Sequence, residues 1–211
     1  MVAAMPPLTF FHTPRTRSTG VLILLEELGV PYTLELVDQK REQQLSAEYR
    51  AINPMGKVPA LQDGETIVTE QVAIFLHLAD RHPELGLAPP PGDPLRGRYL
   101  RWMVFYAASF EPALVDHAMK REPGRRGMSP YGDYDTVIDA IAGMLEPGPW
   151  ILGQRFSAAD LLWGIALGWT MMFGMVPERP VFRALVDRVN ARPAVQRARA
   201  KDEELLATMA G

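Results

Sequence analysis

The sequence predicts an α/β domain at the N-terminus, followed by an all-α helical domain. Up to His82 the residues follow the order strand, helix, strand, a short helical link, two strands and a helix. Residues 88–94 are rich in proline and fit neither a helix nor a central strand. Everything after them has the apolar spacing of helices. We therefore expect domains over residues 1–84 and 95–211, joined by a proline-rich linker over residues 85–94.

The first strand and helix come directly from the apolar pattern. Residues 8–12 form a short run of β-branched and aromatic side chains that Thr13-Pro14 ends, which predicts a strand buried in a sheet. Apolar residues then recur at helical spacing from Val21 and stop at Gly29. Residues 31–37 alternate between apolar and polar, which predicts the second strand.

The third strand starts with a proline. An Asn-Pro-x-Gly turn over residues 53–56 leads into a short apolar run, and Pro59 stands near its start because proline cannot donate a hydrogen bond within a sheet. If the peptide bond before Pro59 is cis, the backbone N–H and C=O of Val58 are exposed as a donor and an acceptor for an extended peptide. The strand order, with proline at this position, is thioredoxin-like.

A carboxylate stands where the fourth strand meets the next helix. The strand ends at Thr69, Glu70 and Gln71 and runs into an amphipathic segment. The free N–H groups of a helix N-terminus bind a carboxylate, and Glu70 binds an ammonium group. This end of the strand is therefore suited to a zwitterionic ligand.

The second half of the chain has only helical signals. Pro112 lies inside the first expected helix and predicts a kink or break near Phe110. Ser157 and Asp160 have the spacing of a capping box, which is a folding element. The expected helices span residues 95–120, 131–146, 158–173 and 180–191, with a last helix after Pro193.

Composition excludes several classes of protein. The net charge of −3, from 22 basic and 25 acidic residues, gives no electrostatic footprint for nucleic acid or for an anionic membrane surface. The chain has no cysteine, which excludes disulfides, thiolate metal sites and a cysteine nucleophile, and we expect no metal. No apolar stretch approaches the ~20 residues that span a bilayer, and the opening residues do not read as a secretory signal. We therefore expect a cytoplasmic protein.

Val58-Pro59 and Glu70, in this order and spacing, resemble the glutathione-binding half of the cytosolic glutathione S-transferase family. In that family a Val-Pro pair holds the cysteinyl backbone of glutathione and a Glu-Ser pair holds its γ-glutamyl end. This chain has Gln71 in place of the serine, and an amide still donates and accepts hydrogen bonds. The resemblance implies that Lys57, Val58, Pro59, Glu70 and Gln71 bind glutathione as co-substrate.

The resemblance extends into the helical half, because residues 150–153 and the capping box resemble a motif at the same place in these transferases. It therefore covers residues from about 8 to about 200, and it implies a thioredoxin-like domain followed by a helical domain that forms the pocket for the electrophile. It also implies a two-fold homodimer.

In the family a hydroxyl or thiol at the start of the first helix faces the glutathione sulfur. A thiol with the ordinary pKa of ~8.5 is only a few per cent ionised at pH 7, and a hydroxyl that donates to the thiolate lowers this pKa. Counting back from the end of the first helix, Thr16 occupies the position of the serine-type members. Ser18 is the second candidate and Thr13 the third. The alternative is that Thr16 or Ser18 only caps the helix.

His12 is interpreted as a strand residue packed beneath the site rather than as a base.

The resemblance implies an apolar electrophile bound by the helical half. Aromatic and methionine side chains make an adaptable apolar wall, although at helical spacing most such residues belong to a core. Tyr106 is the first choice for a polar contact. The candidates for the wall are Trp102, Met103, Phe105, Tyr106, Phe110, Trp169, Met172 and Phe173, with Trp102, Tyr106 and Phe110 preferred.

The leading hypothesis is therefore a glutathione S-transferase that activates the glutathione thiol for attack on an apolar electrophile. The same site also suits isomerisation, reductive dehalogenation or peroxide reduction. The alternative is a non-catalytic glutathione-transferase-like binding or scaffold module, which Gln71 and the ambiguous hydroxyl favour. A plain thioredoxin-type redox protein is close to excluded, because it needs a cysteine.

Overall fold

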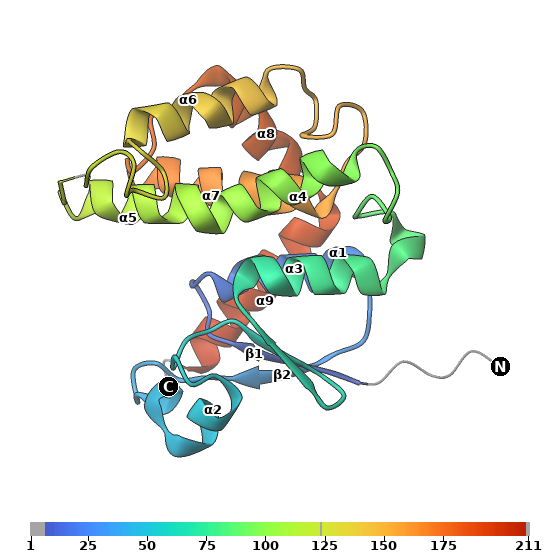
Figure 1. The fold of residues 1–211 in the computed structure, drawn as a ribbon. Coiled ribbons are helices and arrows are strands. Elements are labelled where there is room, and N and C mark those ends of the chain that lie inside the picture. Colours follow the sequence, from blue (N-terminus) through green and yellow to red (C-terminus); the bar gives the residue numbers. More distant parts are fainter. Residues whose placement is uncertain (1–6, 123, 210–211) are drawn as a thin grey trace. The chain divides into compact units, whose positions relative to one another are not determined.

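The computed structural model describes residues 7–122 and 124–209, which fall into two compact units (Figure 1). Of these residues, 7–81 and 192–209 form the first unit and the remainder, within His82–Ala191, form the second. The expected helical domain over residues 95–211 includes the last helix. In the structure that helix belongs to the first unit, because its contacts are with helix α1 of that unit.

The first unit contains a four-stranded mixed sheet. Its strands are β1 (Leu8–His12), β2 (Thr33–Leu36), β3 (Ala60–Asp63) and β4 (Thr66–Thr69), in the order β2-β1-β3-β4. β1 and β2 are parallel, whereas β3 is antiparallel to both of its neighbours. The strands predicted from the sequence are confirmed, and this sheet with its helices is the thioredoxin-like fold that they implied.

Helix α1 connects the two parallel strands. It spans Ser18–Leu28, and Gly29 ends it in the left-handed conformation at φ 66°, which only glycine adopts without a steric cost. Most of its apolar side chains are fully buried, in agreement with the spacing in the sequence. The other helices of this unit are α2 (Ala47–Ile52), α3 (Gln71–Arg81) and α9 (Pro193–Thr208).

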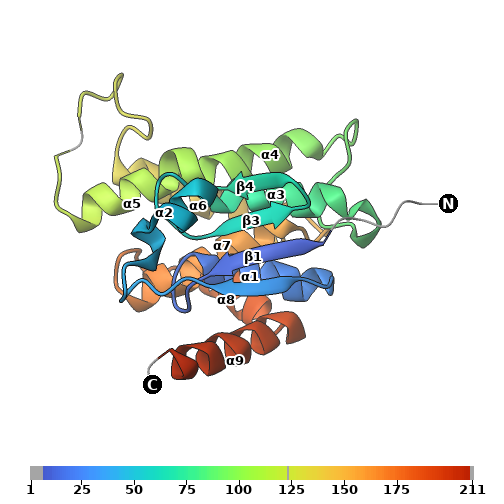
Figure 2. The same ribbon diagram turned by 90° about the horizontal axis from the view of Figure 1, so that it is seen from below.

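Helix α9 packs along α1 in the first unit (Figure 2). Arg192 is bonded to Glu27, and Arg197 lies 3.5 Å from a carboxylate oxygen of Glu26. Lys201 donates to the hydroxyl of Tyr32 at 2.7 Å. These polar contacts flank a buried stripe on α9, so the last helix of the chain is an integral part of the thioredoxin-like unit.

The strand register brings three connections to the same end of the strands. We call this end of the sheet the sheet edge. Phe11 pairs with Ala60, and Ala60 pairs with Thr69. Because these pairs are antiparallel, the C-terminal end of β1, the start of β3 and the end of β4 lie side by side. The segment after β1, the Val58-Pro59 pair before β3 and Glu70 after β4 are therefore neighbours at this edge.

The second unit is helical, as expected. In place of a clean break near Phe110, a π-helical turn over Tyr106–Phe110 joins two α-helices without a gap. Pro112 lacks an N–H and crowds the preceding turn, which explains why the α-helical hydrogen-bond pattern widens just before it. The helices are α4 (Arg96–Phe105), α5 (Glu111–Ala118), α6 (Tyr134–Leu145), α7 (Ala158–Met172) and α8 (Pro180–Asn190).

The capping box at the start of α7 is confirmed. The carboxylate of Asp160 accepts from the backbone N–H groups of Ser157 at 2.8 Å and Ile151 at 2.7 Å, and from the Ser157 hydroxyl at 2.9 Å. Asp160 is fully buried, and this burial raises its pKa to about 6 although the three donors act in the opposite direction. One buried carboxylate thus joins the preceding turn to the helix.

Candidate functional site

The segment before Val58 is held by side chains that bond to its backbone. The carbonyl of Lys57 accepts from the Tyr49 hydroxyl at 2.7 Å and from the Asn53 amide at 2.8 Å. Gly56 has φ 60°, and a Cβ there would lie 2.9 Å from a backbone oxygen of Gln44. The turn predicted at Asn53-Pro54 therefore exists, and it fixes the backbone that leads into β3.

The Val58-Pro59 peptide bond is cis, which meets the condition stated from the sequence. Pro59 is buried, and Val58 is half-buried. Within residues 7–122 and 124–209, no hydrogen bond is found to the backbone N–H or C=O of Val58. Lys57, the neighbouring candidate, is exposed. Val58 thus offers a donor and an acceptor at the edge of the sheet.

Glu70 has an uncommon backbone conformation for a residue with a Cβ, at φ 69°. Its carbonyl accepts from the N–H of Ile74 at 3.0 Å, so this residue begins α3, and its side chain is exposed. Left-handed residues of this kind concentrate at functional sites, where the surrounding structure imposes them. The strained residue in this case is the one whose carboxylate the sequence predicts to bind an ammonium group.

Gln71 follows at the first position of α3, and its amide lies against α1. A Cβ built on Gly20 would come within 2.3 Å of the Gln71 side-chain nitrogen. The N-terminal parts of α1 and α3 are therefore in contact at the same sheet edge, and Gly20 permits this approach because it has no side chain.

The hydroxyls after β1 form one hydrogen-bonded cluster. The Thr16 hydroxyl oxygen lies 2.7 Å from that of Ser18, and both lie within 2.9 Å of the Thr13 carbonyl. The Thr13 hydroxyl donates to the carbonyl of Val37 at 2.6 Å, which ties this turn to the end of β2. Ser18 is 0% exposed, whereas Thr16 is half-buried. Of the three candidates, Thr16 therefore has the most accessible hydroxyl.

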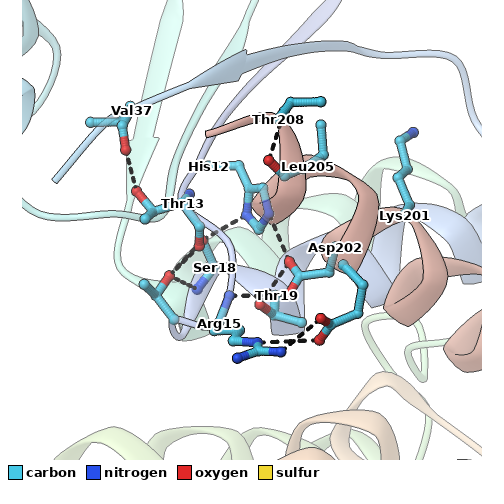
Figure 3. A network of polar contacts seen from close by, with 12 residues as sticks. His12, Thr13, Arg15, Ser18, Thr19, Val37, Lys201, Asp202, Leu205 and Thr208 are labelled. Atoms are coloured by element: carbon cyan, nitrogen blue, oxygen red, sulfur yellow. Dashed lines mark hydrogen bonds and ion pairs between the residues drawn. The ribbon is translucent and has the colours of Figure 1, made fainter. Parts of the chain in front are cut away.

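His12 lies beneath this cluster and is fully buried (Figure 3). Its Nδ1 atom is 2.7 Å from the Ser18 hydroxyl oxygen, and its Nε2 atom is 2.9 Å from Oδ1 of Asp202 on α9. The structure confirms that His12 is a buried residue of β1. Sequence reasoning missed Asp202, because its helix has no local signal that it would pack beside β1.

Asp202 also organises the turn after β1. Its Oδ2 atom accepts from the backbone N–H of Arg15 at 3.0 Å, and Oδ1 accepts from the Thr19 hydroxyl at 3.1 Å. Arg15 has φ 58°, a second left-handed residue in this region. Its guanidinium donates to Glu203, and this hydrogen bond, together with the negative charge of Glu203, raises the pKa of Arg15.

The preferred residues of the predicted electrophile pocket belong to the aromatic core of the second unit. Trp102, Tyr106 and Phe110 are buried, and their rings all contact Trp163. The Tyr106 hydroxyl donates to Glu111 at 2.6 Å. Close packing leaves these rings little surface for a ligand, and their role in a pocket stays a prediction.

Two other candidates for the pocket wall, at the end of α7, are exposed: Met172 is 73% and Phe173 71% accessible. In the described part of the chain, no helix is long and apolar enough to span a membrane. Nor do the described residues contain a group of three or more His, Asp or Glu side chains arranged to hold a metal ion.

Comparisons with known proteins agree with this geometry. The family model described as "Glutathione S-transferase, N-terminal domain" matches residues 16–81. The chain is 30% identical over 191 residues to glutathione S-transferase GstA of Escherichia coli O157:H7, covering 89% of this chain and 95% of that protein.

Solved structures show the same likeness. The chain is 31% identical to a glutathione transferase from Methylococcus capsulatus, with a TM-score of 0.78 and coverage of 93% and 98% of the two chains. It is 30% identical to a glutathione transferase homologue from Sulfitobacter with bound glutathione, with a TM-score of 0.72 and coverage of 93% and 99%. With the sheet-edge geometry and this identity over nearly the whole length, the chain belongs to the glutathione S-transferase family, a class of enzymes.

Proposed function

We propose that this protein binds glutathione at the sheet edge of its first unit and activates the glutathione thiol for attack on an apolar electrophile. The observation that carries the proposal is the convergence at that edge of Val58, Glu70 and Thr16, which the strand register brings together. Glutathione bound to the Sulfitobacter homologue supports the choice of co-substrate.

Each part of glutathione has a matching group at this edge. The N–H and C=O of Val58 pair with the cysteinyl backbone in the manner of an added strand. The N-terminus of α3 receives the γ-glutamyl carboxylate, because the first N–H groups of a helix have no partner within the helix and its dipole favours an anion, and Glu70 binds the ammonium group. Lys57 and Gln71, which flank these residues, complete the set that we propose for glutathione.

Thr16 is the group that we propose to face the sulfur. Its hydroxyl donates to the thiolate, which stabilises the ionised form and lowers the thiol pKa. Ser18 carries a similar hydroxyl, but it is 0% exposed and is bonded to His12 and Thr13. We therefore assign the direct contact to Thr16 and an indirect contribution to Ser18.

The helical unit is proposed to supply the wall for the electrophile. Trp102, Tyr106 and Phe110 stay candidates, and the exposed end of α7 offers two further apolar side chains in Met172 and Phe173. The proposed glutathione-binding domain covers residues 1–84 together with the last helix, the proposed linker covers residues 85–94, and the proposed helical domain lies between that linker and the last helix. A cytoplasmic location remains part of the same proposal.

Calorimetric titration with reduced glutathione tests the binding site. We expect Glu70→Ala to weaken the affinity about tenfold or more, which corresponds to the loss of a hydrogen bond to a charged group, ~1.5–3 kcal/mol. Glu65→Ala is the matched control, since Glu65 is an exposed carboxylate in the turn between β3 and β4. Absence of glutathione binding by the wild-type protein up to millimolar concentrations would refute the proposal.

Turnover of a general aromatic electrophile tests the chemical role of Thr16. Thr16→Ala should lower kcat/KM about tenfold or more while glutathione still binds, and Thr16→Ser should restore most of the rate because it keeps the hydroxyl. If glutathione binds but neither the wild type nor any variant turns over an electrophile, the non-catalytic binding module becomes the better description.

A further inference from the structure

A continuous chain of polar contacts leads from Thr16 into the interior of the first unit. The Thr16 and Ser18 hydroxyl oxygens are 2.7 Å apart, and Ser18 is 2.7 Å from Nδ1 of His12. Nε2 of His12 then lies 2.9 Å from Oδ1 of Asp202 (Figure 3). Thr16 is half-buried and the other three are buried, so the chain runs from an accessible hydroxyl to a buried carboxylate.

The carboxylate bears on the direction of the protons in this chain. A carboxylate accepts hydrogen bonds, and Nε2 of His12 faces that of Asp202 at 2.9 Å although the two atoms are not aligned for a hydrogen bond, so we place the hydrogen of the His12 ring on Nε2. With the ring hydrogen on Nε2, Nδ1 is an acceptor within 2.7 Å of the Ser18 hydroxyl oxygen, and the Ser18 oxygen is in turn within reach of the Thr16 hydroxyl. The Thr13 carbonyl, within 2.9 Å of both hydroxyl oxygens, is a second acceptor for the same two hydrogens. The inward direction, toward His12, is the one that the relay uses.

Asp202, at the buried end of this series of contacts, is held by groups from three different residues. Its three contacts are His12, the Thr19 hydroxyl and the backbone N–H of Arg15, none of which is a permanent cation. The Arg15 guanidinium is bonded to Glu203 instead. The Arg15 guanidinium still acts on Asp202 through its charge, and an imidazolium formed at His12 would place a second cation beside this buried carboxylate.

Lys201, a cation on the same helix as Asp202, is bonded elsewhere. On α9, Lys201 bonds to Tyr32 and lies 3.5 Å from Glu26 of α1. On the side of the sheet, the ring of Phe10 lies 5.3 Å from that of His12. Among the described contacts of the imidazole, Asp202 is the one acidic side chain.

We propose that His12 accepts the proton of the bound thiol through the two hydroxyls, and that Asp202 stabilises the resulting imidazolium. This inference rests on the proposed function, because the thiol is that of the glutathione that Thr16 faces. The S–H bond breaks and its proton binds the Thr16 oxygen. The proton of Thr16 moves to Ser18, and that of Ser18 moves to Nδ1 of His12. The products are a thiolate and an imidazolium, with no proton released to water.

The arrangement has the residue types of a hydrolytic triad but not its accessibility. In such triads the serine oxygen attacks the substrate and the imidazole receives its proton. Ser18 is 0% exposed and sits within the first turn of α1, so no substrate carbon reaches its oxygen. Thr16 is the member of the chain that meets solvent, which makes the transfer of a ligand's proton the chemistry that this geometry supports.

The measurement that tests the proposal compares two quantities in the wild-type protein at pH 7. Ultraviolet absorbance gives the amount of thiolate formed when reduced glutathione binds. Calorimetry in buffers of different ionisation enthalpy gives the number of protons released. We expect thiolate to form with almost no proton released, because His12 retains the proton. Release of one proton per thiolate would overturn the relay and leave the transferase function intact. Absence of any binding heat would overturn the proposed function and the relay with it.

Variants at α9 separate the relay from a structural role. In Asp202→Asn the thiolate should titrate at least one pH unit higher, which is a tenfold smaller thiolate fraction below its pKa, while glutathione affinity stays within about twofold. Glu203→Gln is the matched control, because it removes the same charge from the next residue of the same helix at an exposed pair. If the bound thiol ionises at the same pH in Asp202→Asn and in Glu203→Gln, the relay is refuted. The wild-type proton count does not depend on whether Asp202→Asn folds.

Discussion

At the scale of single residues, the site depends on backbone conformations that ordinary propensities disfavour. Glu70 and Arg15 both have positive φ, and both lie at the sheet edge where the ligand groups converge. A residue with a Cβ in this region costs roughly 1 kcal/mol relative to right-handed backbone. The fold therefore accepts strain at the positions that the proposed chemistry uses.

Replacing Glu70 by glycine should separate stability from function. Glycine relieves the strain at φ 69°, and its greater entropy in the unfolded chain offsets about half of that gain, so we expect a net stabilisation of about 0.5 kcal/mol. Loss of the carboxylate should at the same time weaken glutathione binding about tenfold or more. Denaturant unfolding and calorimetric titration measure the two effects.

Glu42→Gly is the control for that experiment. Glu42 is also exposed and has φ 55°, and it precedes the 3₁₀ turn that packs against Gly56, but it is not among the residues that we propose to bind glutathione. It should gain similar stability and bind glutathione like the wild type. Unchanged glutathione affinity in Glu70→Gly would contradict the role that we give to the Glu70 carboxylate.

The ranking of the three hydroxyls shows what sequence reasoning reaches at this scale. The sequence placed Thr13, Thr16 and Ser18 in the turn before α1, but their order could not be derived, because all three have the same chemistry. Burial and hydrogen bonds separate them: Thr13 donates to Val37, Ser18 is enclosed, and Thr16 remains accessible. The contact of Asp202 with His12 could not be predicted from the sequence, because nearly the whole length of the chain separates the two residues.

At the scale of elements, most of the fold was predictable. Apolar periodicity gave the strands and helices to within a few residues, because each element buries one face. Gly29 and Ser157 were correct signals for the ends of α1 and α7. The position of the irregular turn before Pro112 was predicted, but its type was not. A local sequence rule does not distinguish a kink from a π-helical turn.

The cap of α7 should make stability depend on pH in an unusual direction. Burial raises the pKa of Asp160 to about 6, so between pH 4 and 6 the folded protein binds more protons there than the unfolded chain does. This contribution to the free energy of unfolding is complete below about pH 4 and is lost as the pH rises through 6. Its size is about 3 kcal/mol at most. Asp160→Asn lacks it, so the stability difference between wild type and variant should fall over this range.

Asp133→Asn is the control, because Asp133 caps α6 in a half-buried position, whereas Asp160 is fully buried. Hydrogen bonds from Thr136 lower the pKa of Asp133, so its contribution to stability is present above about pH 4 and is lost only as the pH falls below that value. Denaturant unfolding at several pH values measures both differences. A stability difference for Asp160→Asn that grows as the pH rises from 4 to 6 would contradict the prediction. It would show that the three hydrogen bonds, rather than burial, determine the pKa of Asp160.

At the scale of the whole molecule, family membership leads us to predict a homodimer. Solution mass at micromolar concentration, measured by light scattering or sedimentation, should correspond to two chains. Two-fold symmetric dimers are the commonest assemblies of soluble proteins, and their stability depends on concentration, so the measurement should include a dilution series. A monomer throughout that series would contradict the prediction without affecting the glutathione site, whose proposed residues all lie within the first unit.

The sequence by itself determined the elements, the order of the two domains, the absence of thiol chemistry in the chain and the positions of Val58, Pro59 and Glu70. These follow from local rules, since periodicity, turn chemistry and residue type act over a few neighbouring residues. Only the tertiary structure decided which of the three candidate residues is most exposed, that His12 lies 2.9 Å from Asp202, and that the last helix belongs to the first unit. Such contacts depend on how distant segments pack, and pairing between residues far apart in the chain leaves no mark in a single sequence.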